Sequence, residues 1–261
     1  MTSGLIFLFR FSLLRYLILG DGVMDMITNF AQNKKTMPKS NKDLFEAVVA
    51  KYGLKQEVYA KTLNAFNLFK EQTIQLTDDY HKKIRQTQWP ILFEFKDRGT
   101  FEFELKFGSD ILVFFMHSNV FEFSRDHEVM KSSYIKDDKT RSYCGIIHVF
   151  NFLSDSFKYN RTNDIGYLIG RIFINRESHY FIEGKREIGL LFNHFPTSKL
   201  DLQAIHSIVE SSIEYTLNFD LLTPPYENMK EVTVEEMETT LDNLQIRTGK
   251  RLGFRFQADN S

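Results

Sequence analysis

The sequence has little of what several functional classes require. Cys144 is its one cysteine, which excludes an intramolecular disulfide and a multi-cysteine zinc site and fits a reducing compartment, the cytoplasm. The 33 basic and 34 acidic side chains nearly cancel, so the chain lacks the overall positive charge with which non-specific nucleic-acid binders attract phosphates. Any nucleic-acid site would therefore have to be local.

Recognisable catalytic signatures are missing too. The sequence contains no GxSxG, GxGxxG or P-loop motif, and its seven histidines show neither HxH nor HExxH spacing. Cys144 and His148 share one face of an expected strand, but four residues of strand separate them by about 13 Å, too far for a thiolate and an imidazole to pair. The residues alone therefore predict no resident metal or cofactor.

Long apolar runs are also scarce, and residues 5–19 (LIFLFRFSLLRYLIL) are the one stretch that could address a membrane. This run is shorter than the roughly 20 apolar residues of a spanning helix, and Arg10 and Arg15 lie inside it. It also lacks the leading positive charge and the cleavage site of a secretory signal. Three interpretations stay open: translation that begins at a later methionine, a weak membrane anchor, or a docked helix.

Residues 1–39 therefore form an apolar and then basic N-terminal extension, and we expect residues 40–257 to form a single globular domain. A capping pattern at Ser40 and apolar residues at helical spacing predict a short helix that ends at Gly53. A second apolar series predicts a longer amphipathic helix over residues 56–86, and Trp89 with the following proline ends it.

After this helix the apolar period changes from 3.6 to 2, which is typical of strands. Phenylalanines alternate with charged residues, and nine of the 26 in the chain lie between Phe93 and Phe123. Turn residues divide the region into four runs, so we predict a four-stranded antiparallel meander over residues 91–124. The runs are 91–97, 100–107, 111–117 and 120–124. Their regular alternation assigns the phenylalanines to a buried sheet face, which the long helix would cover.

A charged connector, residues 125–141, precedes a second strand group over residues 143–192. We predict four strands in it: 143–150, 166–174, 179–183 and 186–192. An amphipathic helix that opens at residues 196–198, a final helix from Thr233 and a closing strand follow. Runs of strands flanked by helices predict an α+β fold, an antiparallel sheet covered by amphipathic helices.

Three residues fit a metal-dependent nuclease of the restriction-endonuclease type. Such enzymes place an Asp on one strand and Glu-x-Lys on the next, where two carboxylates hold Mg²⁺ beside a lysine. Here Asp164 precedes one expected strand, and Glu183 and Lys185 end its neighbour. The same Glu-x-Lys spacing recurs at residues 94–96 and 104–106, where it lines the polar face of a strand. A solvated strand face is therefore the simpler explanation of the pattern.

Arg171 lies in the middle of GYLIGRIFI, an otherwise apolar strand. A buried guanidinium needs a partner, because leaving it unpaired costs several kcal/mol. A three-residue hairpin loop would set Glu183 directly opposite Arg171 and make the two a structural ion pair. The alternative is that Arg171 binds an anionic ligand.

The loop FKYNRTND, residues 157–164, concentrates polar side chains just before that strand. A loop on a rigid sheet is a frequent place for recognition of a polar small molecule. The residues that would contact a ligand there are Tyr159, Asn160, Arg161 and Asn163. Asn and Asp also form ordinary turns, so the loop has a structural explanation as well.

The sequence therefore favours a non-enzymatic cytoplasmic binding or regulatory domain that recognises a small polar ligand or a protein partner near Arg171 and the 157–164 loop. Two alternatives remain. One is a Mg²⁺-dependent nuclease acting on nucleic acid through Asp164, Glu183 and Lys185. The other is a membrane-associated structural protein anchored by residues 5–19.

Overall fold

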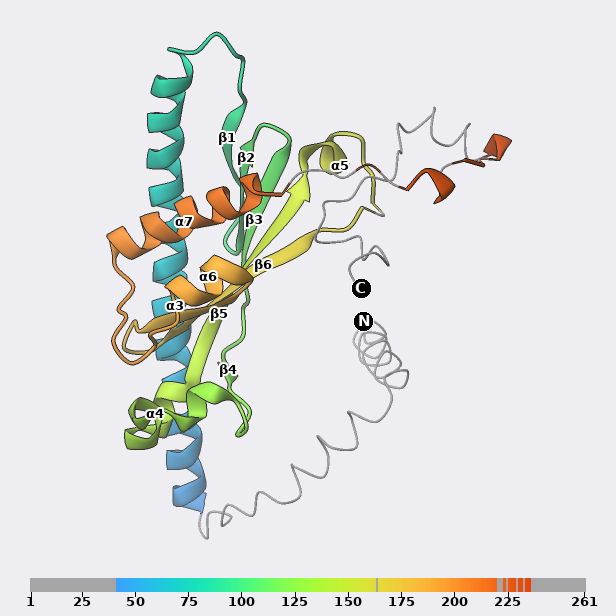
Figure 1. Ribbon diagram of the computed structural model, residues 1–261. Helices are drawn as coiled ribbons and strands as arrows, with labels where there is room; N and C mark the ends of the chain where they lie inside the picture. Colours follow the sequence, from blue (N-terminus) through green and yellow to red (C-terminus); the bar gives the residue numbers. More distant parts are fainter. Residues whose placement is uncertain are drawn as a thin grey trace, which may run out of the picture. The chain divides into compact units, whose positions relative to one another are not determined.

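The computed structural model describes residues 41–162, 164–219, 223, 225–228, 230–231 and 233–235 (Figure 1). Two units can be separated, Met1–Lys51 and Tyr52–Ser261. In the first unit the described part is the beginning of helix α3, which runs over Asn41–Ile84. The expectations for residues 1–39, for Asn163, and for the helix and strand predicted near the C-terminus lie outside the described residues.

Helix α3 is continuous where the sequence predicted two helices with a break at Gly53. A Cβ at Gly53 would meet no atom within 4 Å, so this glycine is exposed and serves no close approach. A single glycine costs a helix only about 1 kcal/mol, which the packing of the remaining turns offsets. Within the second unit, three buried threonines on α3 donate their hydroxyls to the carbonyl four residues earlier: Thr62, Thr73 and Thr77.

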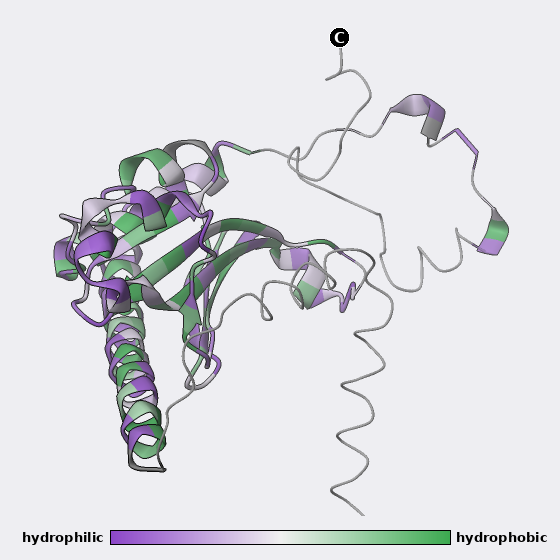
Figure 2. Ribbon diagram, turned by 90° about the horizontal axis from the view of Figure 1, so that it is seen from below, coloured by the Kyte–Doolittle hydropathy of each residue, from purple (hydrophilic) through white to green (hydrophobic). Residues whose placement is uncertain are grey.

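The described residues form one seven-stranded antiparallel sheet, and with its helices this confirms the α+β class. Hydrophobic residues concentrate on the strands and mix with hydrophilic ones on the helices (Figure 2). The strands are β1 (Phe93–Asp97), β2 (Glu102–Phe107), β3 (Asp110–Met116), β4 (Phe121–Glu122), β5 (Tyr143–Leu153), β6 (Tyr167–Asn175) and β7 (Tyr180–Gly184). Their order is β1-β2-β3-β5-β6-β7.

The fourth run of the expected meander pairs differently from the first three. Strand β4 is two residues long and pairs with β5, where Phe121 faces Cys144. Strand β3 pairs with the rest of β5, from Met116 opposite Ile147 to Asp110 opposite Leu153. Strands β3 and β4 thus follow one another along the same edge of β5, and β3 joins the two strand groups into one sheet.

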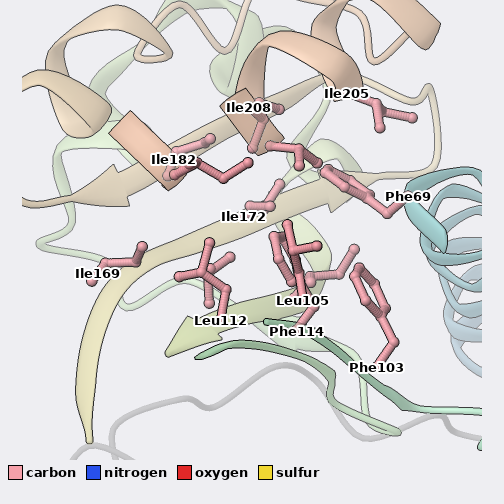
Figure 3. Close-up of a cluster of buried hydrophobic side chains, with 14 of the residues drawn as sticks. Phe69, Phe103, Leu105, Leu112, Phe114, Ile169, Ile172, Ile182, Ile205 and Ile208 are labelled. Atoms are coloured by element: carbon pink, nitrogen blue, oxygen red, sulfur yellow. The ribbon is translucent and has the colours of Figure 1, made fainter. Parts of the chain in front are cut away.

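One face of the sheet packs against α3 and α7 (Leu202–Leu217) in a single hydrophobic cluster. Phe69 of α3 points towards Phe103 and Phe114 (Figure 3). The ring centroids of Phe66 and Phe103 lie 5.4 Å apart, and those of Phe69 and Phe114 lie 6.1 Å apart. Alternate phenylalanines of the strands therefore supply the core, as their spacing predicted.

The opposite face is covered at one end by the charged connector, which we call the cover segment (residues 125–142). It folds into η1 (Glu128–Lys131), α4 (Ser133–Asp137) and η2 (Lys139–Ser142). A smaller hydrophobic cluster lies beneath it, in which Ile135 packs with Ile146, Phe173 and Phe181.

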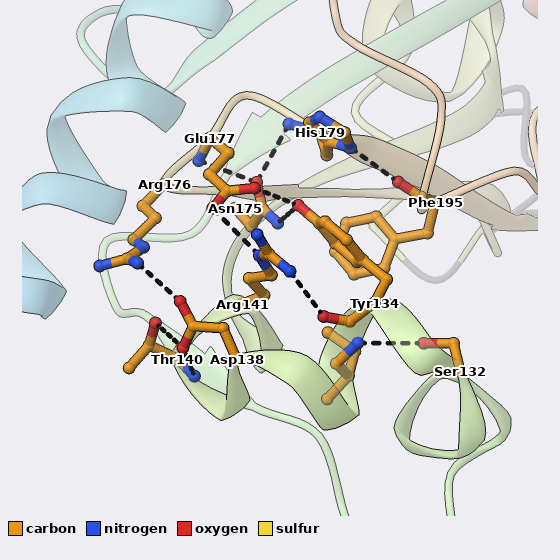
Figure 4. A network of polar contacts seen from close by, with 11 residues as sticks. Ser132, Tyr134, Asp138, Thr140, Arg141, Asn175, Arg176, Glu177, His179 and Phe195 are labelled. Carbon is orange, nitrogen blue, oxygen red and sulfur yellow. Dashed lines mark hydrogen bonds and ion pairs between the residues drawn. The ribbon is translucent and has the colours of Figure 1, made fainter.

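Polar contacts attach the cover segment to the turn between β6 and β7 (Figure 4). The Tyr134 hydroxyl donates to Glu177 Oε2 at 2.8 Å and accepts from Asn175 Nδ2 at 2.8 Å. Arg141 Nε donates to Glu177 Oε1 at 3.0 Å. Burial raises the pKa of Tyr134 to about 12, so its hydroxyl stays protonated and continues to donate.

The stretch 186–192, predicted as a strand, is instead the short helix α6 (Arg186–Leu191). The backbone at Gly189 lies close to the backbone at Gly184. Glycine allows this approach, because a Cβ at residue 189 would lie 2.5 Å from the Gly184 carbonyl oxygen. Helix α7 also begins later than expected: Asp201 caps it by accepting from the Ala204 amide at 2.7 Å. The remaining short elements are α5 (Ser154–Lys158) and η3 (Tyr226–Asn228).

Candidate functional site

We call the face of the sheet that points away from α3 and α7 the open face. The cover segment and α5 lie at opposite ends of β5 (Figure 1). The strand register places Phe115, His148, Arg171 and Glu183 in one row across the open face. Side chains between the two covered ends are partly exposed, and Phe115 is 37% exposed. This face therefore carries both charged and aromatic groups within reach of solvent.

A cleft of about 330 Å³ lies where the open face of β1, β2 and β3 meets α5. We call it the lysine cleft. Its charged lining comprises Glu94, Lys96, Arg98, Glu104, Lys106 and Lys158. The alternation of β1 and β2 explains these residues, since the phenylalanines between them point into the core. Four cations against two carboxylates leave the lining with a formal excess of two positive charges.

Part of this charge is already paired. Arg98 Nε lies 2.8 Å from Glu104 Oε1, and its Nη2 donates to Glu104 Oε2 at 3.0 Å. The hydrogen bond with Glu104 raises the pKa of Arg98, so the guanidinium stays charged in this two-point pair. Within the described part of the chain, no ion pair joins Lys96 or Lys106 to a carboxylate, although each faces a glutamate on the neighbouring strand.

Lys158 reaches the cleft from the end of α5. The amide of Ser154 donates to the Ser109 carbonyl at 2.7 Å, which fixes the start of α5 against the turn before β3. The Lys158 Nζ lies 4.8 Å from the centre of the Tyr159 ring, and hydrogen bonding with Tyr159 raises the pKa of Lys158. Lys158 is therefore a charged and positioned group at the mouth of the cleft.

A row of contacting rings begins at the cleft and crosses the open face. It consists of Phe157, Phe152, Phe150, His148, Phe115 and His117, which we call the aromatic row. Successive ring centroids lie 5.4, 6.5, 5.8, 6.3 and 6.4 Å apart. Burial lowers the pKa of His148, with Arg171 and His117 adding to the effect, so its ring is neutral at pH 7.

The predicted recognition loop contributes to this site through its first residues. Phe157 and Lys158 line the cleft, and Tyr159 contacts Lys158. Asn160 takes a positive φ of 49°, the conformation of a turn residue. Arg161 is buried, and its Nε lies 3.1 Å from Asp164 Oδ2. Arg161 therefore stabilises the loop internally and is absent from the cleft lining.

Arg171 is paired with Glu183, as the three-residue hairpin loop predicted. The same carboxylate also bonds to His127, whose Nε2 lies 2.8 Å from Glu183 Oε1. Val129 donates its amide to His127 Nδ1, so the neutral ring carries its proton on Nε2 and donates it to Glu183. Glu183 thus links His127 of the cover segment to Arg171 of the sheet.

The two carboxylates of the nuclease pattern, Asp164 and Glu183, belong to separate ion pairs. Asp164 accepts from the Ser156 hydroxyl at 2.6 Å and pairs with Arg161 before β6 begins. Glu183 faces Arg171, which lies four strand residues, or about 13 Å, beyond the start of β6 at Tyr167. Among the described residues, no group of three or more His, Cys, Asp or Glu side chains could hold a metal ion.

The charged residues of the cleft could be predicted from the sequence to lie on an exposed strand face, but the cleft itself could not be predicted. Lys96 and Lys106 belong to the repeated Glu-x-Lys spacing, which indicates a solvated strand face. The alternation did place them on the face away from the core. Only the position of α5, set by the Ser154 and Ser109 contact, turns that face into a concave site.

Comparison of the chain with protein-family models, with curated proteins and with solved structures found no match. None of the helices in the described residues has the length and apolar character needed to cross a membrane, and residues 5–19 lie outside this search.

Proposed function

We propose that this chain is a non-enzymatic cytoplasmic binding domain whose lysine cleft holds a small anionic ligand. One observation carries the proposal: Lys96, Lys106 and Lys158 line one cleft, while Arg98 already neutralises Glu104. Glu94 is the remaining carboxylate of the lining. Three ammonium groups in one concavity repel one another, and an anion between them replaces this repulsion with attraction.

The expected strength follows from Coulomb's law. A unit charge about 4 Å from each of three ammonium groups gains about 1 kcal/mol per pair in water, and repulsion from Glu94 offsets about one of these pairs, which leaves about 2 kcal/mol. This corresponds to a Kd of roughly tens of millimolar for a simple anion. A cognate ligand with further contacts to the cleft would bind more tightly, because its polar and apolar parts would add to the charge term.

Binding is favoured over catalysis by the chemistry of the lining. Among the described residues that line the cleft, there is no histidine or cysteine to serve as a base or a nucleophile near neutral pH. The ligand site also differs from the one first expected around Arg171, whose guanidinium is engaged by Glu183. No observation favours the nuclease or the membrane-anchored protein, and we propose neither.

Isothermal titration calorimetry with inorganic pyrophosphate tests the proposal. We expect saturable binding that weakens at least tenfold in the variant Lys96→Gln with Lys106→Gln, because each lost lysine removes about 1 kcal/mol. The control is Lys136→Gln, an exposed lysine on α4 outside the cleft. Equal binding by both variants, or no binding by the wild-type chain, would refute the proposal.

A further inference from the structure

The aromatic row narrows the class of anion that the lysine cleft would take. Phe157 belongs to both features: it lines the cleft and contacts Phe152, the next ring of the row. Phe157 is 45% exposed, and Phe115 near the other end is 37% exposed. The two exposed rings and the partly exposed rings between them form a surface on which flat, apolar groups can stack.

The spacing of the row suits a chain of flat groups. Three of its rings belong to alternate residues of β5: His148, Phe150 and Phe152. Consecutive Cα atoms in this set are about 7 Å apart along the strand. Leu168 of β6 faces Phe150 and is also exposed, which widens the apolar surface beside the row. The neutral His148 ring adds no charge to this stacking surface at pH 7.

Charged side chains are spread unevenly over this face, and Glu102 lies directly opposite Phe115. The lysines gather at the α5 end, where the row begins. Farther along, Glu183 is neutralised by Arg171. A matching ligand therefore presents anionic groups to the lysines and flat rings to the aromatic row. Single-stranded nucleic acid has this composition, since its phosphates are anionic and its unpaired bases stack on aromatic side chains.

We propose that the open face binds a short single-stranded segment of nucleic acid, with phosphates in the lysine cleft and bases on the aromatic row. The inference rests on the proposed anion site and adds the identity of its ligand. Double-stranded nucleic acid does not fit, because its bases are stacked and paired and cannot reach the rings. The near-zero net charge of the chain supplies no overall attraction for phosphates, so the interaction depends on local charge.

Fluorescence anisotropy with the full-length chain tests this inference, using a labelled oligothymidylate of about eight nucleotides. We expect unlabelled oligothymidylate to compete far better than thymidine monophosphate or a duplex of the same length. Three lysine contacts predict a slope of about −2 for the logarithm of the binding constant against that of the salt concentration. Phe115→Ala should weaken binding at least about fivefold, as loss of one stacking partner does.

The control for the ring substitution is Phe45→Ala, which removes a phenylalanine of α3 that is 66% exposed. It should leave oligonucleotide binding unchanged. If the oligonucleotide binds no better than thymidine monophosphate, or if Phe115→Ala binds as the wild type does, the nucleic-acid inference fails and the anion site stands. If neither the oligonucleotide nor pyrophosphate binds, both proposals fail.

Discussion

The contact between α3 and β5 at Gly145 gives a stability prediction of definite sign. Gly145 lies on the core face of β5, directly against the buried Thr62 of α3. A Cβ built at Gly145 would lie 2.7 Å from both Cβ and Cγ2 of Thr62, and closer still to its Oγ1. Ordinary carbon contacts are about 3.5–4.0 Å, so the substitution Gly145→Ala creates an overlap of about 1 Å.

Rotation of Thr62 cannot relieve this overlap, because the Cβ atom of the threonine is itself too close and a β-branched side chain is stiff at χ1. Helix α3 must therefore move away from β5. Overpacking of this kind costs about 1–3 kcal/mol, and because it shifts a whole helix we expect about 3 kcal/mol. With a urea m-value of about 2 kcal/mol/M, the unfolding midpoint would fall by about 1.5 M.

Urea denaturation followed by circular dichroism measures this change. The control is Gly53→Ala, the same substitution on an exposed part of α3, which should stabilise the chain by up to about 1 kcal/mol because a helix prefers alanine. Adding Thr62→Gly to Gly145→Ala should recover most of the lost stability. An unchanged or raised midpoint for Gly145→Ala would refute the packing of α3 against β5 at this position.

Three further predictions concern the open face and its cover. Burial lowers the pKa of His148 below its ordinary value of 6.5, so the unfolded chain binds a proton at this residue more tightly than the folded chain does. The stability of the fold should therefore fall as the pH drops below about 6.5. The variant His148→Gln should show a smaller fall between pH 7.5 and pH 5.5 in urea titrations. A variant with the wild-type pH dependence would contradict this assignment. Tyr134→Phe removes the hydrogen bond to Glu177 and should destabilise the chain by about 1 kcal/mol in the same assay, whereas an unchanged midpoint would show that the contact adds nothing. With Mg²⁺ or Mn²⁺, neither the wild type nor Glu183→Ala should cleave a plasmid; cleavage by the wild type that the variant lacks would revive the nuclease interpretation.

The strands could be predicted from the sequence because their pattern is local. Alternation of phenylalanine with charged residues in β1 and β2 indicated both the strands and the buried side of each. The pairing of Arg171 with Glu183 was one of two arrangements open to the sequence, and the three-residue length of the hairpin loop decides between them. Where period and turn length decide the structure, a single sequence is sufficient.

The remaining features depend on contacts that no local pattern contains. Helix α6 occupies an apolar stretch that resembles a strand, and the approach of Gly189 to Gly184 determines its path. The break expected at Gly53 is absent because the helix continues through it. The lysine cleft required the placement of α5 on the open face, which joins Lys158 to residues some 50–60 positions earlier in the chain.

Chemical-shift mapping of backbone amides during a pyrophosphate titration tests the central claim most directly. An anion held by the lysine cleft should shift the amide signals of Lys96, Lys106 and Lys158 and their strand neighbours, and the shifts should saturate together. Shifts centred on Arg171 and Glu183 would place the ligand at the other end of the face. That result, or no saturable shift at all, would contradict the account given for this protein.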